Sequence, residues 1–213
     1  IIDSRTLVVV ISQSGETLDT MAALREAKSL GARILSIVNV VGSSIARESD
    51  DVLYTWAGPE IAVATTKAYS TQMAVLDLLA IYLAGQRKTI TAEDMRRLTS
   101  AIAALPAQVE QILSNREQIQ YYASQYFNHD SVFFIGRNLD YALGMEGSLK
   151  LKEISYIHSE AYASGELKHG TISLIEPGTL VVALGSYTPL FDKAMSNVIE
   201  VKARGASVLA LAT

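Results

Sequence analysis

The sequence contains no cysteine, which excludes disulfide bonds, thiolate metal sites and a cysteine nucleophile within these 213 residues. Its three histidines (His129, His158 and His169) are too scattered to indicate a metal cluster. Positive charge is not in excess: 18 Lys and Arg residues against 22 Asp and Glu residues give a net charge of −4, so nucleic acid is not an expected partner. The longest apolar run, residues 74–84, contains Asp77 and is far shorter than the ~20 residues of a membrane span. We therefore expect a core helix there and no membrane segment.

The composition and the apolar runs are typical of a folded α/β protein. Hydrophobic residues make up 49% of the chain and charged residues 19%, which excludes a disordered chain. Residues 6–12 form a continuous β-branched run, as expected of a strand buried in a parallel sheet. A helical pattern over residues 16–30, closed by Gly31, and an apolar run over residues 34–38 complete a right-handed βαβ unit. Further strands are predicted over residues 52–55, 131–136 and 179–184, and helices over residues 66–83, 92–104, 106–126 (with Pro106 in the first turn) and 139–156.

Two parts of the chain are similar to each other. Residues 6–11 align with residues 179–184, and residues 27–35 align with residues 201–209 once one residue is inserted. The sequence therefore predicts two copies of one α/β unit.

The two copies contain different parts of the unit. The second copy has a strand and a helix (residues 131–157) that the first lacks, and the first has a strand and a helix (residues 52–83) that the second lacks. We expect a fragment that lacks one strand–helix pair at each end. Its predicted parts are a first domain over residues 1–88, a helical connection over residues 89–127 and a second domain over residues 128–213.

The polar segment Ser12-Gln-Ser-Gly-Glu-Thr17, between the first predicted strand and its helix, is a candidate anion site. An anion there meets free backbone N–H groups and the positive end of the helix dipole, and the hydroxyls add donors. The spacing is neither that of a P-loop nor that of a dinucleotide-binding loop, and an ordinary helix cap is the competing interpretation. The second copy has Gly185-Ser-Tyr-Thr188 at the equivalent joint, so we expect one ligand site, in the first copy.

Glu146, Lys150 and Glu153 are four and three residues apart, so they share one face of the predicted helix over residues 139–156. The flanking residues are mostly apolar: Ala142, Leu143, Leu149 and Ile154. Placing charges among apolar residues costs free energy unless the charges are paired or take part in function. The pattern therefore favours a functional site over a solvated row of ion pairs.

Two other segments carry polar chemistry. Residues 164–170 predict a mobile, glycine-flanked loop on which His169 suits proton transfer, although a surface loop with a chance histidine is an equally good interpretation. Residues 60–67 predict a helix entry whose hydroxyls serve ligand contact or capping. Trp56 is expected to fill a core or an interface.

These segments resemble the isomerase domain of the glutamine–fructose-6-phosphate aminotransferase (glucosamine-6-phosphate synthase) family. The similar stretches are residues 12–17, 57–68, 149–158 and 165–170, and the resemblance covers essentially the whole chain. It implies two flavodoxin-like αβα subdomains of the sugar isomerase (SIS) type with parallel sheets, each incomplete here.

The resemblance also implies roles for individual residues. Those expected to bind the substrate phosphate are Ser12, Gln13, Ser14 and Thr17. Those expected to contact the sugar are Val63, Ala64 and Thr65, the last being Ser in most family members. In the remaining set, Glu153 would move a proton between C1 and C2, Lys150 would assist it, Glu146 would orient the cluster, and His169 would open the sugar ring from the partner subunit.

The activity that the resemblance implies is conversion of fructose 6-phosphate and glutamine-derived ammonia to glucosamine 6-phosphate, in a cytoplasmic homodimer without metal or organic cofactor. The glutaminase domain and the C-terminal tail of the family are not in this sequence, so we expect the isolated chain to bind sugar phosphate weakly without completing aminotransfer. Two alternatives stay open. One is a stand-alone glucosamine-6-phosphate deaminase or fructosamine-phosphate deglycase of the same fold, and the other is a module that senses sugar phosphate without catalysis.

Overall fold

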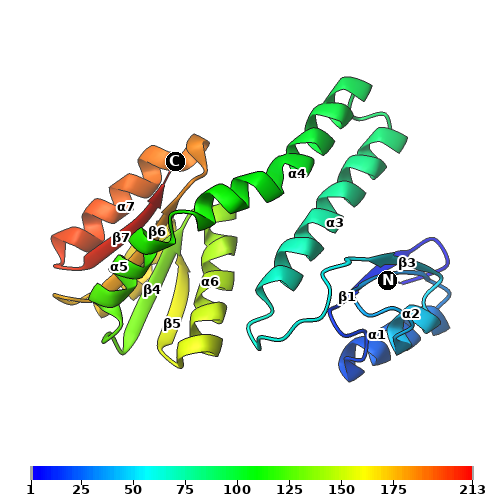
Figure 1. Cartoon of the computed structure of the whole chain (residues 1–213), viewed down its shortest axis with the longest axis horizontal. Helices are drawn as coiled ribbons and strands as arrows, with labels where there is room; N and C mark the ends of the chain where they lie inside the picture. The colour runs from blue at the N-terminus through cyan, green and yellow to red at the C-terminus, as the bar shows by residue number, and fades with distance from the viewer. Residues whose placement is uncertain (1, 213) are drawn as a thin grey trace. The chain divides into compact units, whose positions relative to one another are not determined.

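The computed structural model describes residues 2–212 and contains two compact α/β units, Ile1–Leu113 and Ser114–Thr213 (Figure 1). The elements of the first unit are β1 (Leu7–Ser12), α1 (Leu18–Ser29), β2 (Arg33–Val38), α2 (Ser44–Glu48), β3 (Asp51–Tyr54), α3 (Thr66–Gln86) and α4 (Ala92–Leu113). Those of the second are α5 (Arg116–Tyr126), β4 (Ser131–Gly136), α6 (Leu139–Ser155), β5 (His158–Ala163), the 3₁₀ turns η1 (Ser164–His169) and η2 (Thr171–Leu174), β6 (Leu180–Gly185), η3 (Thr188–Leu190), α7 (Phe191–Ala203) and β7 (Ser207–Ala212). Among residues 2–212, no helix has the length and apolar character needed to cross a bilayer.

The first unit is built on a parallel sheet in the order β1-β2-β3. Helices α1 and α2 pack on one face of it, where Val10, Leu24 and Ile34 belong to a single buried cluster (Figure 1). Because side chains alternate along a strand, Leu7 and Val9 point to the opposite face and are exposed. This packing places the ends of all three strands, and the loops that follow them, at one edge of the sheet.

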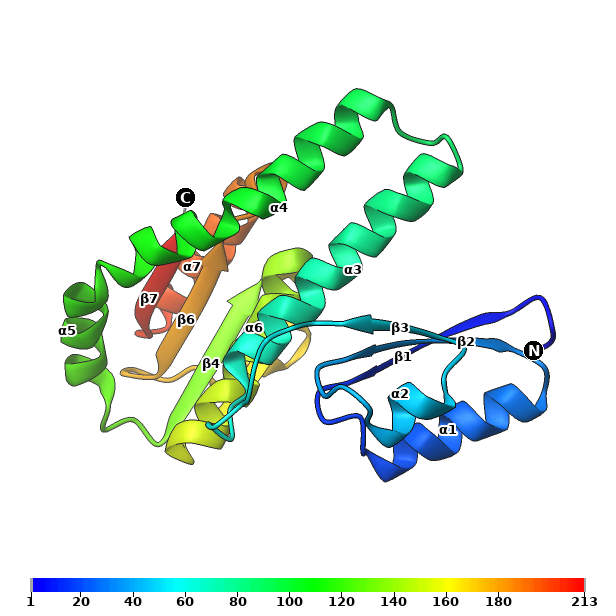
Figure 2. The ribbon, with the colours of Figure 1, turned by 45° about the vertical axis from the view of Figure 1, so that its right-hand side comes forward.

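The second unit has a four-stranded parallel sheet in the order β5-β4-β6-β7. Helix α7 packs on the face that carries Phe133 and Val181, and α6 packs on the opposite face, beside Phe134 (Figure 2). Both faces are therefore covered, as the hydrophobic runs of β4 and β6 require.

The strand register agrees with the sequence alignment between the two copies. Leu7 lies opposite Arg33 in the β1–β2 pair, and the aligned residue Leu180 lies opposite Ser207 in the β6–β7 pair. The segments β1–α1–β2 and β6–α7–β7 are thus the same structural unit in two copies.

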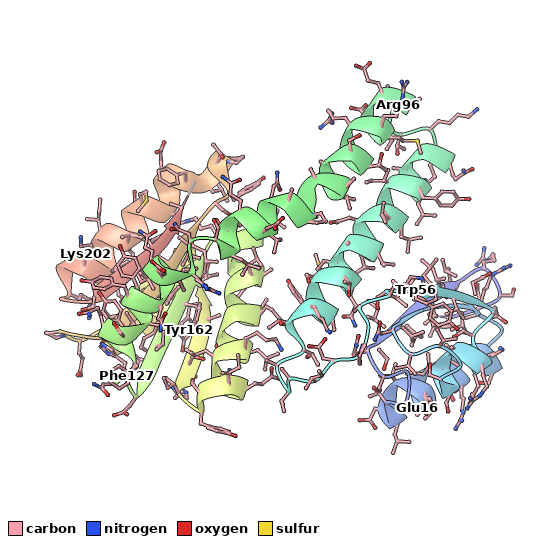
Figure 3. The ribbon with its side chains drawn as sticks, viewed as in Figure 1. Glu16, Trp56, Arg96, Phe127, Tyr162 and Lys202 are labelled. Carbon is pink, nitrogen blue, oxygen red and sulfur yellow. The ribbon has the colours of Figure 1, made fainter. Side chains whose placement is uncertain are left out.

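Three details of the fold differ from what the sequence led us to expect. Pro106 does not begin a helix but lies inside α4, which continues to Leu113, because a proline costs one backbone hydrogen bond without always ending a long amphipathic helix. The strand β5 was not predicted, since its sequence His-Ser-Glu-Ala-Tyr-Ala is polar, which is compatible with its position at the sheet edge (Figure 3 labels Tyr162 on it). Trp56 is not in the core of its unit: it is 76% exposed, and its ring is tilted by 55° against that of Tyr54 with ring centroids 5.7 Å apart. A place in an interface stays a prediction.

Candidate functional site

The loop between β1 and α1 is held together by its own hydroxyl groups. The Ser12 hydroxyl is buried, accepts the Gly15 N–H at 3.1 Å and shares a hydrogen bond with the Thr17 hydroxyl at 2.9 Å. Ser14 is exposed, and its hydroxyl accepts the Glu16 N–H at 3.2 Å. Thr17 is the N-cap of α1, yet its side chain forms no capping hydrogen bond, which leaves N–H groups of the first turn of α1 available as donors.

Gly15 is fixed in this loop by both conformation and space. Its φ is +67°, and a Cβ atom there would lie 2.0 Å from the Ser43 hydroxyl and 2.5 Å from the Ser43 Cβ. The Gly15 carbonyl accepts the N–H of Ile45 at 2.9 Å, and the Glu16 carboxylate accepts the N–H of Ser44 at 2.8 Å. That hydrogen bond is the main cause that lowers the pKa of Glu16 (labelled in Figure 3). The N-terminal end of α2 therefore holds the loop in place through these two hydrogen bonds.

Asn39, which follows β2, connects this loop to the segment after β3. Its backbone N–H donates to the Gln13 carbonyl at 3.2 Å, and its side-chain oxygen accepts the Ala57 N–H at 2.8 Å. Its side-chain amide donates to the Gly58 carbonyl at 2.8 Å. The sequence reasoning missed Asn39, although an Asn placed directly after a buried strand is the available signal. It brings two of the predicted site segments to the same edge of the sheet.

The segment predicted to contact the sugar lies directly before α3. Val63 is exposed, Ala64 is buried, and Thr65 is the N-cap of α3. Thr65 has a φ of +48°, a left-handed conformation that is unfavourable for a β-branched residue. Such strain is most often found at functional sites.

Helix α6 holds a lysine between two carboxylates. The Lys150 Nζ lies 2.7 Å from Glu153 Oε2 and 3.5 Å from Glu146 Oε1, and all three side chains are less than one third exposed. Burial alone would lower the pKa of Lys150, but the hydrogen bond to Glu153 and the two negative charges outweigh it and raise that pKa. Lys150 is therefore a fixed cation beside two partly desolvated carboxylates, an arrangement suited to proton transfer at a carbon next to a carbonyl.

The surroundings of this triad differ from the expectation. Leu149 and Ile154, predicted to bury it, are 43% and 64% exposed in this chain. The side of α6 that packs on the sheet is the one with Gly144 and Ser148, because small residues allow the helix to approach closely. The sequence therefore predicted the shared face of the three charges correctly and the buried side of the helix incorrectly.

His169 lies on η1 rather than on an open loop. Leu167 of η1 is buried in the core, and Lys168 forms an ion pair with Glu200 of α7 at 2.9 Å, which holds the turn. The His169 side chain is 76% exposed, and its Nε2 lies 3.9 Å from the Glu166 carboxylate. Across residues 2–212, no hydrogen bond or ion pair joins His169 to Lys150 or Glu153.

The parallel sheets, with a hydroxyl-rich loop at the start of a helix, define a parallel α/β domain, a class in which ligands bind beyond the C-terminal ends of the strands. Comparison with known proteins identifies the family: the SIS domain model matches residues 1–82 and 125–213. The chain belongs to the SIS domain family.

Named relatives are glutamine–fructose-6-phosphate aminotransferases (isomerizing). The protein of Clostridium acetobutylicum is 56% identical over 212 residues, and that of Caldanaerobacter subterraneus subsp. tengcongensis is 58% identical over 212 residues. In both cases the alignment covers 100% of this chain and 35% of the relative. Among solved structures, the C-terminal domain of glucosamine-fructose-6-phosphate aminotransferase from Francisella tularensis is 39% identical with a TM-score of 0.95, covering 100% of this chain and 60% of that one. The chain thus spans about a third of the length of its curated relatives.

Proposed function

We propose that this chain is the sugar-phosphate isomerase part of a glutamine–fructose-6-phosphate aminotransferase, which converts fructose 6-phosphate and glutamine-derived ammonia to glucosamine 6-phosphate. The observation that carries the proposal is the position of Lys150 between two half-buried carboxylates on α6. A module that only senses sugar phosphate has no need of an acid–base group. The similarity to aminotransferases along the whole chain gives independent support.

In this proposal the loop after β1 binds the substrate phosphate. Ser14 and Thr17 are exposed and carry hydroxyl groups, and Ser12 orders the loop through its hydrogen bonds to Gly15 and Thr17. The Gln13 Oε1 is buried, and among the described residues it has no hydrogen-bond partner in this chain. Val63, Ala64 and Thr65 contact the sugar, and the strained backbone of Thr65 supports a role in binding.

The proposed chemistry is a proton transfer between adjacent carbons. After ammonia has replaced the C2 oxygen of the open-chain sugar, which leaves as water, to give a protonated imine, the Glu153 carboxylate takes a proton from C1. The C1–H electrons form the C1=C2 double bond of the enolamine, and the C2=N π electrons become the lone pair of the nitrogen. The same carboxyl group then returns the proton to C2, the C1 hydroxyl releases its proton to water, and the oxygen electrons form the C=O bond of the C1 aldehyde. Lys150 stabilises the charge beside it and Glu146 orients Lys150, as the two ion pairs support.

The remaining parts of the proposal concern assembly. His169 opens the sugar ring and acts on the site of a second copy in a homodimer, for which its exposed side chain on a well-anchored turn is suited. The functional parts are a first subdomain over residues 1–88, a helical connection over residues 89–127 and a second subdomain over residues 128–213. The complete enzyme is cytoplasmic and carries a glutaminase domain outside this chain.

The alternative is a stand-alone deaminase or deglycase of the same fold. The discriminating experiment measures the intact mass and N-terminal residue of the natural full-length product, and then assays it with fructose 6-phosphate and glutamine. We expect a much longer chain that begins with Cys and forms glucosamine 6-phosphate. A product that contains only the two SIS units and releases ammonia from an amino-sugar phosphate would contradict the proposal, and sugar-phosphate binding without turnover would indicate a sensor.

A further inference from the structure

The second unit has its own candidate binding position, at the point where its strand order reverses. From β4 the chain moves to β5 on one side, and from β6 it moves to β7 on the other, so the reversal lies between β4 and β6. In parallel α/β sheets, ligands bind beyond the C-terminal ends of the two strands at such a point. Here those ends are Gly136 and Gly185.

This position is filled by a side chain of the protein. The Asp140 carboxylate accepts the backbone N–H groups of Ser186 and Tyr187, both at 3.0 Å, and the Ser186 hydroxyl at 2.5 Å. Asp140 is 2% exposed, whereas Ser186 is at the surface. Three donors of one loop thus converge on a carboxylate that lies 46 residues earlier in the chain.

The local structure of the β4–α6 turn delivers Asp140 to this point. A Cβ at Gly136 would lie 2.5 Å from the Asp140 carbonyl carbon, so only glycine allows the first turn of α6 to approach the end of β4 so closely. Asn138 has a φ of +53°, which turns the chain sharply into the helix. An acidic residue in the first turn of a helix usually stabilises the N-terminal end of that helix. Asp140 instead accepts hydrogen bonds from the loop after β6.

The equivalence of the two copies relates this contact to the loop after β1. Because Leu7 and Leu180 occupy the same register position, Gln13 and Ser14 correspond to Ser186 and Tyr187. The donors of the second loop hold a carboxylate at the place where, in the proposed function, the first loop holds a phosphate.

We propose that Asp140 is a built-in anion that occupies the oxyanion site of the second unit and thereby restricts sugar-phosphate binding to the first unit. The restriction to the first unit rests on the proposed function, whereas the occupied oxyanion site does not. The chemistry that this site selects is a small oxyanion, carboxylate or phosphate, bound by two backbone N–H groups and a hydroxyl. Asp140 is a specificity-determining residue.

The test uses hydrogen–deuterium exchange in the full-length protein, read on peptides that cover residues 180–190. In Asp140→Ala we expect these amides to exchange about tenfold faster or more, because they lose hydrogen bonds to a charged group. Sodium formate replaces the missing carboxylate and is expected to restore slow exchange saturably, relative to sodium chloride at equal ionic strength. Unchanged exchange in Asp140→Ala, or no difference between formate and chloride, would overturn the proposal.

Two controls separate the site from a general loss of stability. Ser148→Ala removes a buried hydrogen bond of α6 to Ser159 and should show no response to formate. Asp140→Asn keeps the shape but loses the charge, so we expect faster exchange than in the wild type and no formate effect. If Asp140→Ala does not fold, equal exchange in Asp140→Asn and wild type still contradicts the proposal.

Calorimetry with fructose 6-phosphate tests the restriction to one site. We expect one molecule per wild-type chain, and two per chain would overturn the role of Asp140. If fructose 6-phosphate does not bind at all, the proposed function and the restriction that rests on it are both contradicted. The claim that Asp140 occupies an oxyanion site is tested separately, by the effect of formate on hydrogen exchange. The two failures are therefore distinguishable.

Discussion

Gly15 shows how a single residue sets the conformation of the candidate phosphate loop. We expect Gly15→Ala to destabilise the first unit by the ~1–2 kcal/mol of a left-handed conformation and by a further ~1–3 kcal/mol of overpacking against Ser43. Gly42→Ala is the matched control, since Gly42 has a φ of +73° but no atom within 4 Å of the added Cβ. It should lose only the ~1–2 kcal/mol of stability that the left-handed conformation costs. Denaturant unfolding followed by the fluorescence of Trp56, the single tryptophan, measures both. Equal losses in the two variants would contradict the close packing on Ser43.

Ser14 is the residue on which phosphate binding can be tested with least disturbance, because its side chain is exposed. We expect Ser14→Ala to weaken binding of fructose 6-phosphate to the full-length protein by ~1.5–3 kcal/mol, the contribution of a hydrogen bond to a charged group. Calorimetry measures the affinity. Ser29→Ala, at the other end of α1, should leave it unchanged, since the Ser29 hydroxyl donates to the Glu26 carbonyl of the same helix. An unchanged affinity for Ser14→Ala would remove this residue from the phosphate site.

Residues of the site were predictable where the signal is local. The hydroxyls and glycine of residues 12–17, and the spacing of the charges on α6, can be recognised from the sequence alone. Asp140 could not be, because its role comes from contacts 46–47 residues away along the chain. For Asn39 the signal was only its place directly after a buried strand, because its partners lie in two other segments of the chain. Whether the predicted residues bind and catalyse as proposed stays a prediction.

Among the elements, η1 illustrates how a segment with little regular structure is held in place. Asn197 is buried, accepts two N–H groups of Arg137 and donates to Glu200, which pairs with Lys168 of η1. This chain of contacts links the end of β4 to the turn that carries His169. The sequence suggested a mobile loop because two glycines flank it, and long-range anchors of this kind leave no local signal.

The pH dependence of stability tests this anchoring. The hydrogen bond from Lys168 is the largest cause that lowers the pKa of Glu200 below its ordinary value of 4.5, against an opposing effect of burial. Because the folded pKa is depressed, the unfolded chain binds the proton first, so this contribution to stability is present above about pH 4.5 and is lost as the pH falls further. We expect Glu200→Gln to be less stable than the wild type at neutral pH and to lose less stability on acidification.

Denaturant unfolding followed by circular dichroism at a series of pH values measures this difference. Glu26→Gln, an exposed position on α1, serves as the control and should follow the wild-type curve. If the curves for Glu200→Gln and wild type ran parallel through the acidic range, the ion pair with Lys168 would not stabilise the fold.

Element prediction worked best for buried strands and long helices. The strands β2, β4 and β6 are apolar runs because they lie inside their sheets. The run of β1 was also recognised, but β1 is an edge strand whose Leu7 and Val9 are exposed, so the expectation that both of its faces are buried was wrong. The polar edge strand β5 and the passage of α4 through Pro106 were missed, since neither follows the local pattern that identifies an element. For α6 the period was correct, but which side faces the sheet depends on packing by Gly144 and Ser148.

At the scale of the whole molecule, the internal repeat carries most of the argument. Both copies end their helix with a glycine of nearly the same conformation, Gly31 with a φ of +87° and Gly205 with a φ of +88°, before the next strand. The copies differ in the loop that follows the first strand of the unit. The hydroxyls of residues 12–17 form hydrogen bonds within their own loop, whereas the loop after β6 donates to Asp140. A framework present in two copies therefore supports a single proposed phosphate site because the two loops differ in sequence and in partners.

The central claim is that Glu153 transfers the proton between C1 and C2, and its most direct test is Glu153→Gln in the full-length protein. Formation of glucosamine 6-phosphate and affinity for fructose 6-phosphate are measured side by side, with Glu176→Gln, an exposed position, as the control. We predict that turnover falls by about 10²–10⁴-fold, the contribution typical of a general acid–base group, while the affinity is unchanged. Turnover at the wild-type rate in Glu153→Gln would contradict the account.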